Sequence, residues 1–182
     1  KWALISTIAP AAHQARLFRG VSSPQTAAMI MLKGQELGLS LTASFEFIQM
    51  IEGQPPAVSP RGALALIHNS PECAGLRVTR LTDDKGVFVG YEVWMKRRTG
   101  FEHTERWTLD DARRAGLIKT KGAWETYPEN MCKWRAIGFC ADVVFPDVLG
   151  GLKTADQYGA ALDAQGDVVA GQWTDAPDTA AD

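Results

Sequence analysis

Cationic and aromatic side chains are interleaved in residues 119–151, where a loop is followed by a continuous helical pattern. This mixture suits single-stranded nucleic acid, because cations neutralise phosphates and rings such as those of Trp124 and Trp134 stack on unpaired bases for roughly 1–3 kcal/mol each. Trp134 recurs with apolar residues at helical spacing and is expected in the core. Trp124 has no such periodic partner, so stacking on a base and stacking on a neighbouring subunit both stay open.

The lysines and arginines are concentrated in one part of the chain, with ten of the 19 between Lys96 and Arg135, where six acids also lie. An ordinary solvated surface explains any single one of them. Together they occupy a predicted hairpin tip (96–98), a helix end (113–114) and a loop (119–121), which can line one side of a groove if the sheet packs against the last helix. Arg135 differs because its helix is otherwise apolar, so it either pairs with a buried acid or reaches a phosphate.

The sequence contains no GxSxG, P-loop, HExxH or paired glycine-rich dinucleotide motif, and so lacks the usual apparatus of serine hydrolases, ATPases, zinc proteases and NAD enzymes. The histidines His13, His68 and His103 are far apart. His103 shares a predicted strand face with Glu105, and an exposed pair explains this better than an acid/base couple. We therefore predict no catalytic residues.

Metal chemistry has little support. The three cysteines form no CxxC pair and have no histidine at ligand spacing, so neither a zinc site nor a disulfide framework is indicated. A metal-dependent nuclease built from acids such as Glu46, Glu52 and Asp142 stays open as an alternative, although their spacing does not favour it over solvated surface. We expect no metal and no cofactor.

Charge is unevenly distributed along the 182 residues, whose formal net charge is -2 and whose composition is 46% hydrophobic. Residues 1–153 hold 19 bases against 15 acids, which gives +4, whereas the remaining residues hold six acids and no base. We expect one folded domain over residues 1–158 and a flexible acidic tail over 159–182. The start at Lys1 instead of Met suggests a fragment. Without a long apolar run or a signal peptide, a cytoplasmic protein with no membrane contact is expected.

Local patterns predict an α+β fold: a small antiparallel β-meander and a β-hairpin packed with several helices, a long C-terminal helix and a disordered acidic tail. Ser-Pro pairs at 23–24 and 59–60 mark helix starts, and DDKG and RRTG segments mark hairpin turns. Residues 1–22 are only weakly helical in pattern. The expected helices are 24–37, 42–47, 59–69, 108–116 and 126–145, the expected hairpin is 47–58, and the expected meander strands are 76–81, 87–95 and 101–107.

Several short motifs, taken in order, resemble phage-type single-strand annealing proteins of the RecT/Redβ kind over residues 24–158. They are QELGLS (35–40), FIQMIEGQPPAVSPRGALALI (47–67), WTLDDARRAGL (107–117), KGAW (121–124), YP (127–128), MCKWRA (131–136) and FPDVL (145–149).

This resemblance implies an ATP-independent recombinase that coats single-stranded DNA as a ring or helical homo-oligomer and pairs it with a complementary strand. A phage exonuclease or a host single-strand-binding protein is an implied partner, in the cytoplasm of a bacterial cell. The alternatives are the metal-dependent nuclease and a recombination or replication scaffold that does not touch DNA. The motifs place the DNA contacts at Arg61, Lys121, Trp124, Lys133 and Arg135, and we add Lys96, Arg97 and Arg98 as a second group.

Overall fold

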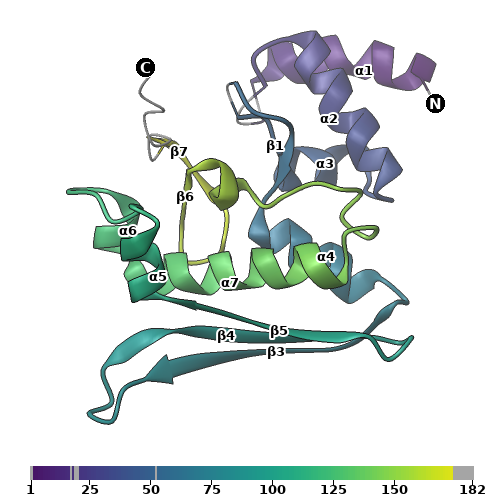
Figure 1. Ribbon diagram of the computed structural model, residues 1–182. Coiled ribbons are helices and arrows are strands. Elements are labelled where there is room, and N and C mark those ends of the chain that lie inside the picture. Colours follow the sequence, from purple (N-terminus) through teal and green to yellow (C-terminus); the bar gives the residue numbers. More distant parts are fainter. Residues whose placement is uncertain (1, 17, 19–20, 52, 174–182) are drawn as a thin grey trace, which may run out of the picture.

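A computed structural model describes residues 2–16, 18, 21–51 and 53–173 of the chain. Helices and small antiparallel sheets are mixed along it, which confirms the α+β class (Figure 1). The helices are α1 (Trp2–Ala15), α2 (Pro24–Glu36), α3 (Leu41–Phe47), α4 (Pro60–Asn69), α5 (Leu109–Arg114), α6 (Ala123–Thr126), α7 (Pro128–Val144) and the 3-10 turn η1 (Ala155–Tyr158). The strands are β1 (Ile48–Gln49), β2 (Ala57–Val58), β3 (Cys73–Thr82), β4 (Phe88–Arg97), β5 (Glu102–Thr108), β6 (Ala160–Leu162) and β7 (Val168–Trp173).

The predicted meander is a three-stranded sheet in the order β3-β4-β5. Alternation along β4 sends Tyr91, Val93 and Met95 to one face, and the last two are fully buried there. Helix α7 lies across that face (Figure 1), while no described element covers the opposite face. Only one face of the sheet packs against a helix, which fits the alternation of buried and exposed residues along its strands.

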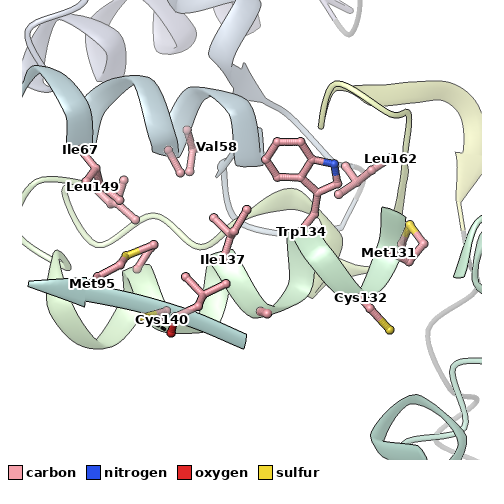
Figure 2. Close-up of a cluster of buried hydrophobic side chains, with 14 of the residues drawn as sticks. Val58, Ile67, Met95, Met131, Cys132, Trp134, Ile137, Cys140, Leu149 and Leu162 are labelled. Atoms are coloured by element: carbon pink, nitrogen blue, oxygen red, sulfur yellow. Dashed lines mark hydrogen bonds between the residues drawn. The ribbon is translucent and has the colours of Figure 1, made fainter. Parts of the chain in front are cut away.

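Helix α7 is the centre of the main core, since it packs on the sheet on one side and meets α4, η1 and β6 on others. Figure 2 shows side chains from these elements converging around Ile137: Met95 of β4, Ile67 of α4, and Cys140 of α7 itself. Each such side chain contributes about 1.5–3 kcal/mol when fully removed from water. The helix is thus held in place on several sides at once, which fixes where its polar residues point.

Helices α1, α2 and α3 form a second, separate core around Ile5, Ile30 and Phe45. The weak helical pattern expected for residues 1–22 is a complete helix over α1. Gly34 of α2 allows α3 to approach, because a Cβ there would lie 1.8 Å from Ser44 Oγ. None of the helices in the described part of the chain has the length and hydrophobicity needed to cross a bilayer.

Both Ser-Pro pairs lie at helix starts, as predicted. The side chains of Ser23 and Ser59 each accept a hydrogen bond from the backbone N–H three residues on, and Thr108 and Asp111 form a reciprocal capping box. Thr126, the first residue of the expected helix 126–145, does not cap α7, because its hydroxyl donates to the carbonyl of Gly122. Residue 127 occupies the cap position without a side-chain hydrogen bond.

The acidic stretch after residue 158 differs from expectation. Residues 160–173 form the antiparallel hairpin β6–β7, and Leu162 packs into the main core at 1% exposure. The expectation of a structureless tail is therefore wrong for this stretch, because small apolar residues between the acids supply a buried face. Residues 174–182 lie outside the described residues, and the domain boundary at 158 stays a prediction.

Candidate nucleic-acid interface

Arg135, one of the predicted DNA contacts, is paired inside the protein. Its Nε lies 3.0 Å from Asp156 Oδ2, with side-chain exposures of 9% and 0%, and its Nη2 donates to the Asp156 carbonyl at 2.8 Å. Three rings surround the guanidinium at 5.5–5.7 Å, those of Trp107, Trp124 and Phe139. Burial raises the pKa of Asp156, and the charge of Arg135 opposes that shift. Arg135 was expected to pair with a buried acid or to reach a phosphate, and the structure shows the first of these.

Trp124 is 1% exposed, so its ring is unavailable to a base or to a neighbouring subunit in this conformation. It lies on the short helix α6, which the sequence predicted as loop, and its ring is 6.4 Å from that of Trp107. Its neighbours include Trp107 of β5 and Arg135 of α7, which lie outside its own short helix. This explains why no periodic signal revealed them.

Arg61 and Lys133 are brought together by the fold, although α4 and α7 are far apart in the chain. Both contact the turn of the β6–β7 hairpin: Arg61 Nε lies 3.0 Å from Asp167 Oδ1, and Lys133 Nζ donates to the Ala164 carbonyl at 3.4 Å. The Arg61 side chain is 46% exposed. The stem of Lys133 lies along Trp134, with Nζ 4.5 Å from the ring centroid, and burial lowers the pKa of the amine. These two cations form the best-defined pair of the predicted set.

Lys96 and Arg97 are the last two residues of β4 and Arg98 begins the hairpin tip, but the three side chains have different environments. Lys96 pairs with Glu102 across the hairpin at 3.3 Å, and Arg98 is exposed at the tip. Arg97 is held by Asp147 at 2.6 Å and by the Val144 carbonyl at 2.9 Å. Arg97 therefore fastens the hairpin to the end of α7, and it has little freedom to follow a DNA strand.

Lys121 is exposed in the loop before α6 and adopts a left-handed backbone conformation with φ 62°. Its N–H donates to the Glu125 carboxylate at 2.5 Å, which holds this loop against the helix start. The loop lies beyond the end of β5, whereas Arg98 lies at the other end of the same sheet (Figure 1). The single groove wall expected from these two groups of cations is therefore not formed within one chain.

The uncovered sheet face carries a pair that the sequence did not single out. Arg77 of β3 places its guanidinium 5.2 Å from the centroid of the Trp94 ring on β4. Trp94 can lie across β3 because position 75 is glycine, where a Cβ would come within 2.9 Å of the ring. The sequence could have indicated this pair only through the strand register, in which residue 77 lies opposite residue 94. The position of the hairpin turn sets that register.

The residues of the alternative metal site are scattered in the described structure. Glu46 is exposed on α3, Asp142 is half-buried on α7 with its pKa raised by burial, and Glu52 lies outside the described residues. Within the described ranges, no three His, Cys, Asp or Glu side chains are grouped as metal ligands.

The family model that describes the RecT family matches residues 5–169, which span nearly the whole described fold. The chain belongs to the RecT family. Membership in the RecT family assigns it to single-strand annealing recombination of the phage type, and the matched range includes the start of β7. None of the curated proteins compared with this RecT-family chain matches it.

Proposed function

We propose that this protein binds single-stranded DNA as a homo-oligomer and anneals it to a complementary strand without hydrolysing ATP. The observation that carries the proposal is the RecT-family match across residues 5–169. Annealing needs no catalytic group, because pairing of the two strands supplies the driving force once the protein has held one strand extended. A surface that neutralises phosphates and leaves base edges free is sufficient for this task.

Arg61 and Lys133 are the proposed central phosphate contacts, because two separate helices place an exposed and a half-buried cation against one turn. Lys121, Lys96 and Arg98 are exposed or partly exposed and are proposed to contact DNA at other points along the oligomer. Arg97, Arg135 and Trp124 act indirectly, since each is already engaged within the fold. Contacts of this type address the backbone and predict indifference to base sequence.

The deciding experiment mixes complementary oligonucleotides with the protein in the absence of ATP and follows annealing by fluorescence transfer. Lys133→Gln should slow annealing and lower the slope of log affinity against log salt concentration by about 0.7, the value for one phosphate contact on a single strand. Lys85→Gln on the exposed β3–β4 turn is the matched control, because it removes the same charge elsewhere. Equal salt slopes for both variants would refute the proposed contact.

Oligomeric state belongs to the same proposal. We expect rings or helical filaments in particle images of the protein with DNA, in keeping with its family, and a location in the cytoplasm of a bacterial cell. A phage exonuclease or a host single-strand-binding protein is the proposed partner. A protein that stays monomeric at saturating DNA would contradict this part.

The uncovered sheet face favours one second candidate, a scaffold that binds a replication or recombination protein through Trp94 and Arg77. Under this function, Trp94→Ala would abolish capture of the partner, while Lys133→Gln would leave every measured property unchanged. Magnesium-dependent shortening of end-labelled DNA, lost in Glu46→Gln, would instead favour the nuclease alternative.

A further inference from the structure

The turn of the β6–β7 hairpin lies on the two cations to which we assign DNA phosphate. Asp167 faces Arg61, and the Ala164 carbonyl faces Lys133. The Arg61 backbone N–H also points to the Gly166 carbonyl at 3.5 Å. The turn thus presents one carboxylate and two carbonyl oxygens to donors of α4 and α7. Oxygen acceptors of this kind are also what a phosphodiester presents.

The hairpin is built to hold this turn in one shape. Asp163 Oδ1 accepts from the N–H groups of Gln165 and Asp167 at 2.9 and 3.0 Å, which closes the turn. Asn130 of α7 donates to the carbonyls of Leu162 and Asp163 at 2.9 and 2.6 Å. These bonds fix the base of the turn, and Arg61 and Lys133 are the cations that contact the turn among the described residues.

Gly166 allows the turn to approach α7 closely. Its φ is +85°, and a Cβ on it would lie 2.6 Å from carbons of the Trp134 ring. The turn therefore covers Trp134, the ring on which the Lys133 side chain also rests. Moving the turn away would free both the cation and part of the ring in one step.

The contact between Asp167 and Arg61 is a weak one. Nε and Oδ1 are 3.0 Å apart, but Oδ1 receives no well-directed hydrogen bond from the described residues. Burial is the main cause that raises the pKa of Asp167. The charge of Arg61 opposes this shift without cancelling it, while the charges of Asp163 and Glu46 add to it. The partners of Lys133 among the described residues are uncharged: the Ala164 carbonyl and the Trp134 ring. A phosphate, which is fully charged and accepts several hydrogen bonds, is a better partner for both cations.

We propose that residues 163–167 are a built-in competitor for DNA phosphate at Arg61 and Lys133, so that the turn and a DNA strand occupy these cations in alternation. This inference rests on the proposed DNA-binding function. It assigns to the hairpin the role of keeping the site closed until a strand is present. Asp167 is its key residue, because it carries the charge that a phosphate would replace.

The test measures affinity for a fluorescent thymidine oligonucleotide by anisotropy. Asp167→Asn keeps the backbone bonds of the turn and removes the charge, so affinity should rise by about twofold to fivefold, the range that an exposed ion pair supports. Asp84→Asn is the control, since it makes the same change of net charge on the exposed β3–β4 turn. An increase no larger than that of the control would overturn the proposal.

A double variant shows whether Asp167 acts through its partner. In an Arg61→Gln background, Asp167→Asn should give no gain beyond that of Asp84→Asn, because the cation that it competes for is gone. Amide hydrogen exchange of residues 160–169 gives a second readout: exchange should become faster when DNA is added. Slower exchange would mean that the hairpin closes over the strand, which contradicts competition.

Failure of the inference is distinguishable from failure of the proposed function. Suppose that the wild-type protein binds DNA and that Arg61→Gln weakens this binding, but that Asp167→Asn behaves like its control. Then only the competitor role of the turn is refuted. If wild-type protein shows no binding even at low salt, the DNA-binding function itself falls. The thermal midpoint of Asp167→Asn, compared with the wild type, establishes that the variant folds.

Discussion

Arg135 and Asp156 form an ion pair that joins α7 to η1 in the interior, with Nε 3.0 Å from Oδ2 and both of these atoms fully buried. The carboxylate receives little else, so the pair depends on mutual attraction in a poorly solvated place. The guanidinium of Arg135 also lies 5.5 Å from the centroid of the Trp124 ring. Arg135 and Trp124, both first expected to contact DNA, therefore support each other inside the protein. Any influence of these two residues on DNA binding is indirect, because they hold α6 and η1 in place.

Removing one member of this pair should cost stability. Arg135→Gln leaves Asp156 uncompensated, and we expect the free energy of unfolding in urea to fall by about 3–5 kcal/mol. Arg98→Gln, at an exposed position, should change it by no more than about 0.5 kcal/mol. If Arg135→Gln instead kept full stability and lost only DNA affinity, Arg135 would be a direct contact after all.

Trp124 should behave as a core residue. Trp124→Ala is expected to destabilise the protein by about 3–5 kcal/mol, the usual cost of truncating a buried large aromatic side chain. Trp94→Ala on the uncovered sheet face should cost clearly less, because Trp94 is only half-buried. Thermal and urea unfolding of both variants decide the matter, and equal losses would contradict the burial of Trp124.

Gly138 of α7 is required by the close approach of Thr154, whose Oγ1 would lie 2.2 Å from an added Cβ. In a helix without this contact, Gly→Ala would stabilise by roughly 0.5–1 kcal/mol. We expect Gly138→Ala to destabilise by about 1–3 kcal/mol, as overpacking does, and Thr154→Ala to recover part of the loss in the double variant. A Gly138→Ala protein more stable than wild type would show that this packing is loose.

Acid should weaken the start of α5. Hydrogen bonds from Thr108 hold the pKa of Asp111 below its usual value, with a further contribution from Arg114. A pKa lowered by folding gives stability that is complete above the unfolded value of about 3.9 and is lost as the pH falls through the folded value. Asp111→Asn lacks this dependence. The stability difference between the two proteins should therefore be constant above about pH 5 and shrink below pH 4, as followed by circular dichroism.

Two of the three cysteines should be unreactive in the folded protein. Burial raises the pKa of Cys132 and Cys140 to about 12, so almost no thiolate exists at pH 8, whereas Cys73 is partly exposed. A chromogenic disulfide reagent should detect one thiol in the native state and three in denaturant. Rapid reaction of a second thiol in the native state would indicate opening of the core around α7.

The sequence predicted most elements because their signals are local. Ser23 and Ser59 before proline marked α2 and α4, and alternation with glycine turns marked β3, β4 and β5. The environment of Arg135 could not be predicted in this way, because its partner Asp156 lies in an acidic, low-hydrophobicity stretch that gives no sign of burial. The β6–β7 hairpin was missed for the same reason: its stability comes from α7 and not from its own composition.

For the candidate site, residue type was predictable and accessibility was not. Arg61 and Lys133 were chosen from short motifs, and only the tertiary fold shows that they share one hairpin turn. Trp124 was chosen for the absence of a periodic partner, yet a short helix can bury a side chain without any period. Exposure depends on contacts between distant segments, which no local pattern contains.

The guanidinium of Arg97 joins three segments: Glu72 before β3, its own position at the end of β4, and Asp147 after α7. The tip at residues 98–101 is therefore connected to the last turn of α7 by side-chain contacts as well as by the sheet. A neighbouring molecule that pulled on this tip would load the same helix that carries Lys133 at its other end. Through Arg97, the position of the hairpin tip and the position of α7 are thus coupled.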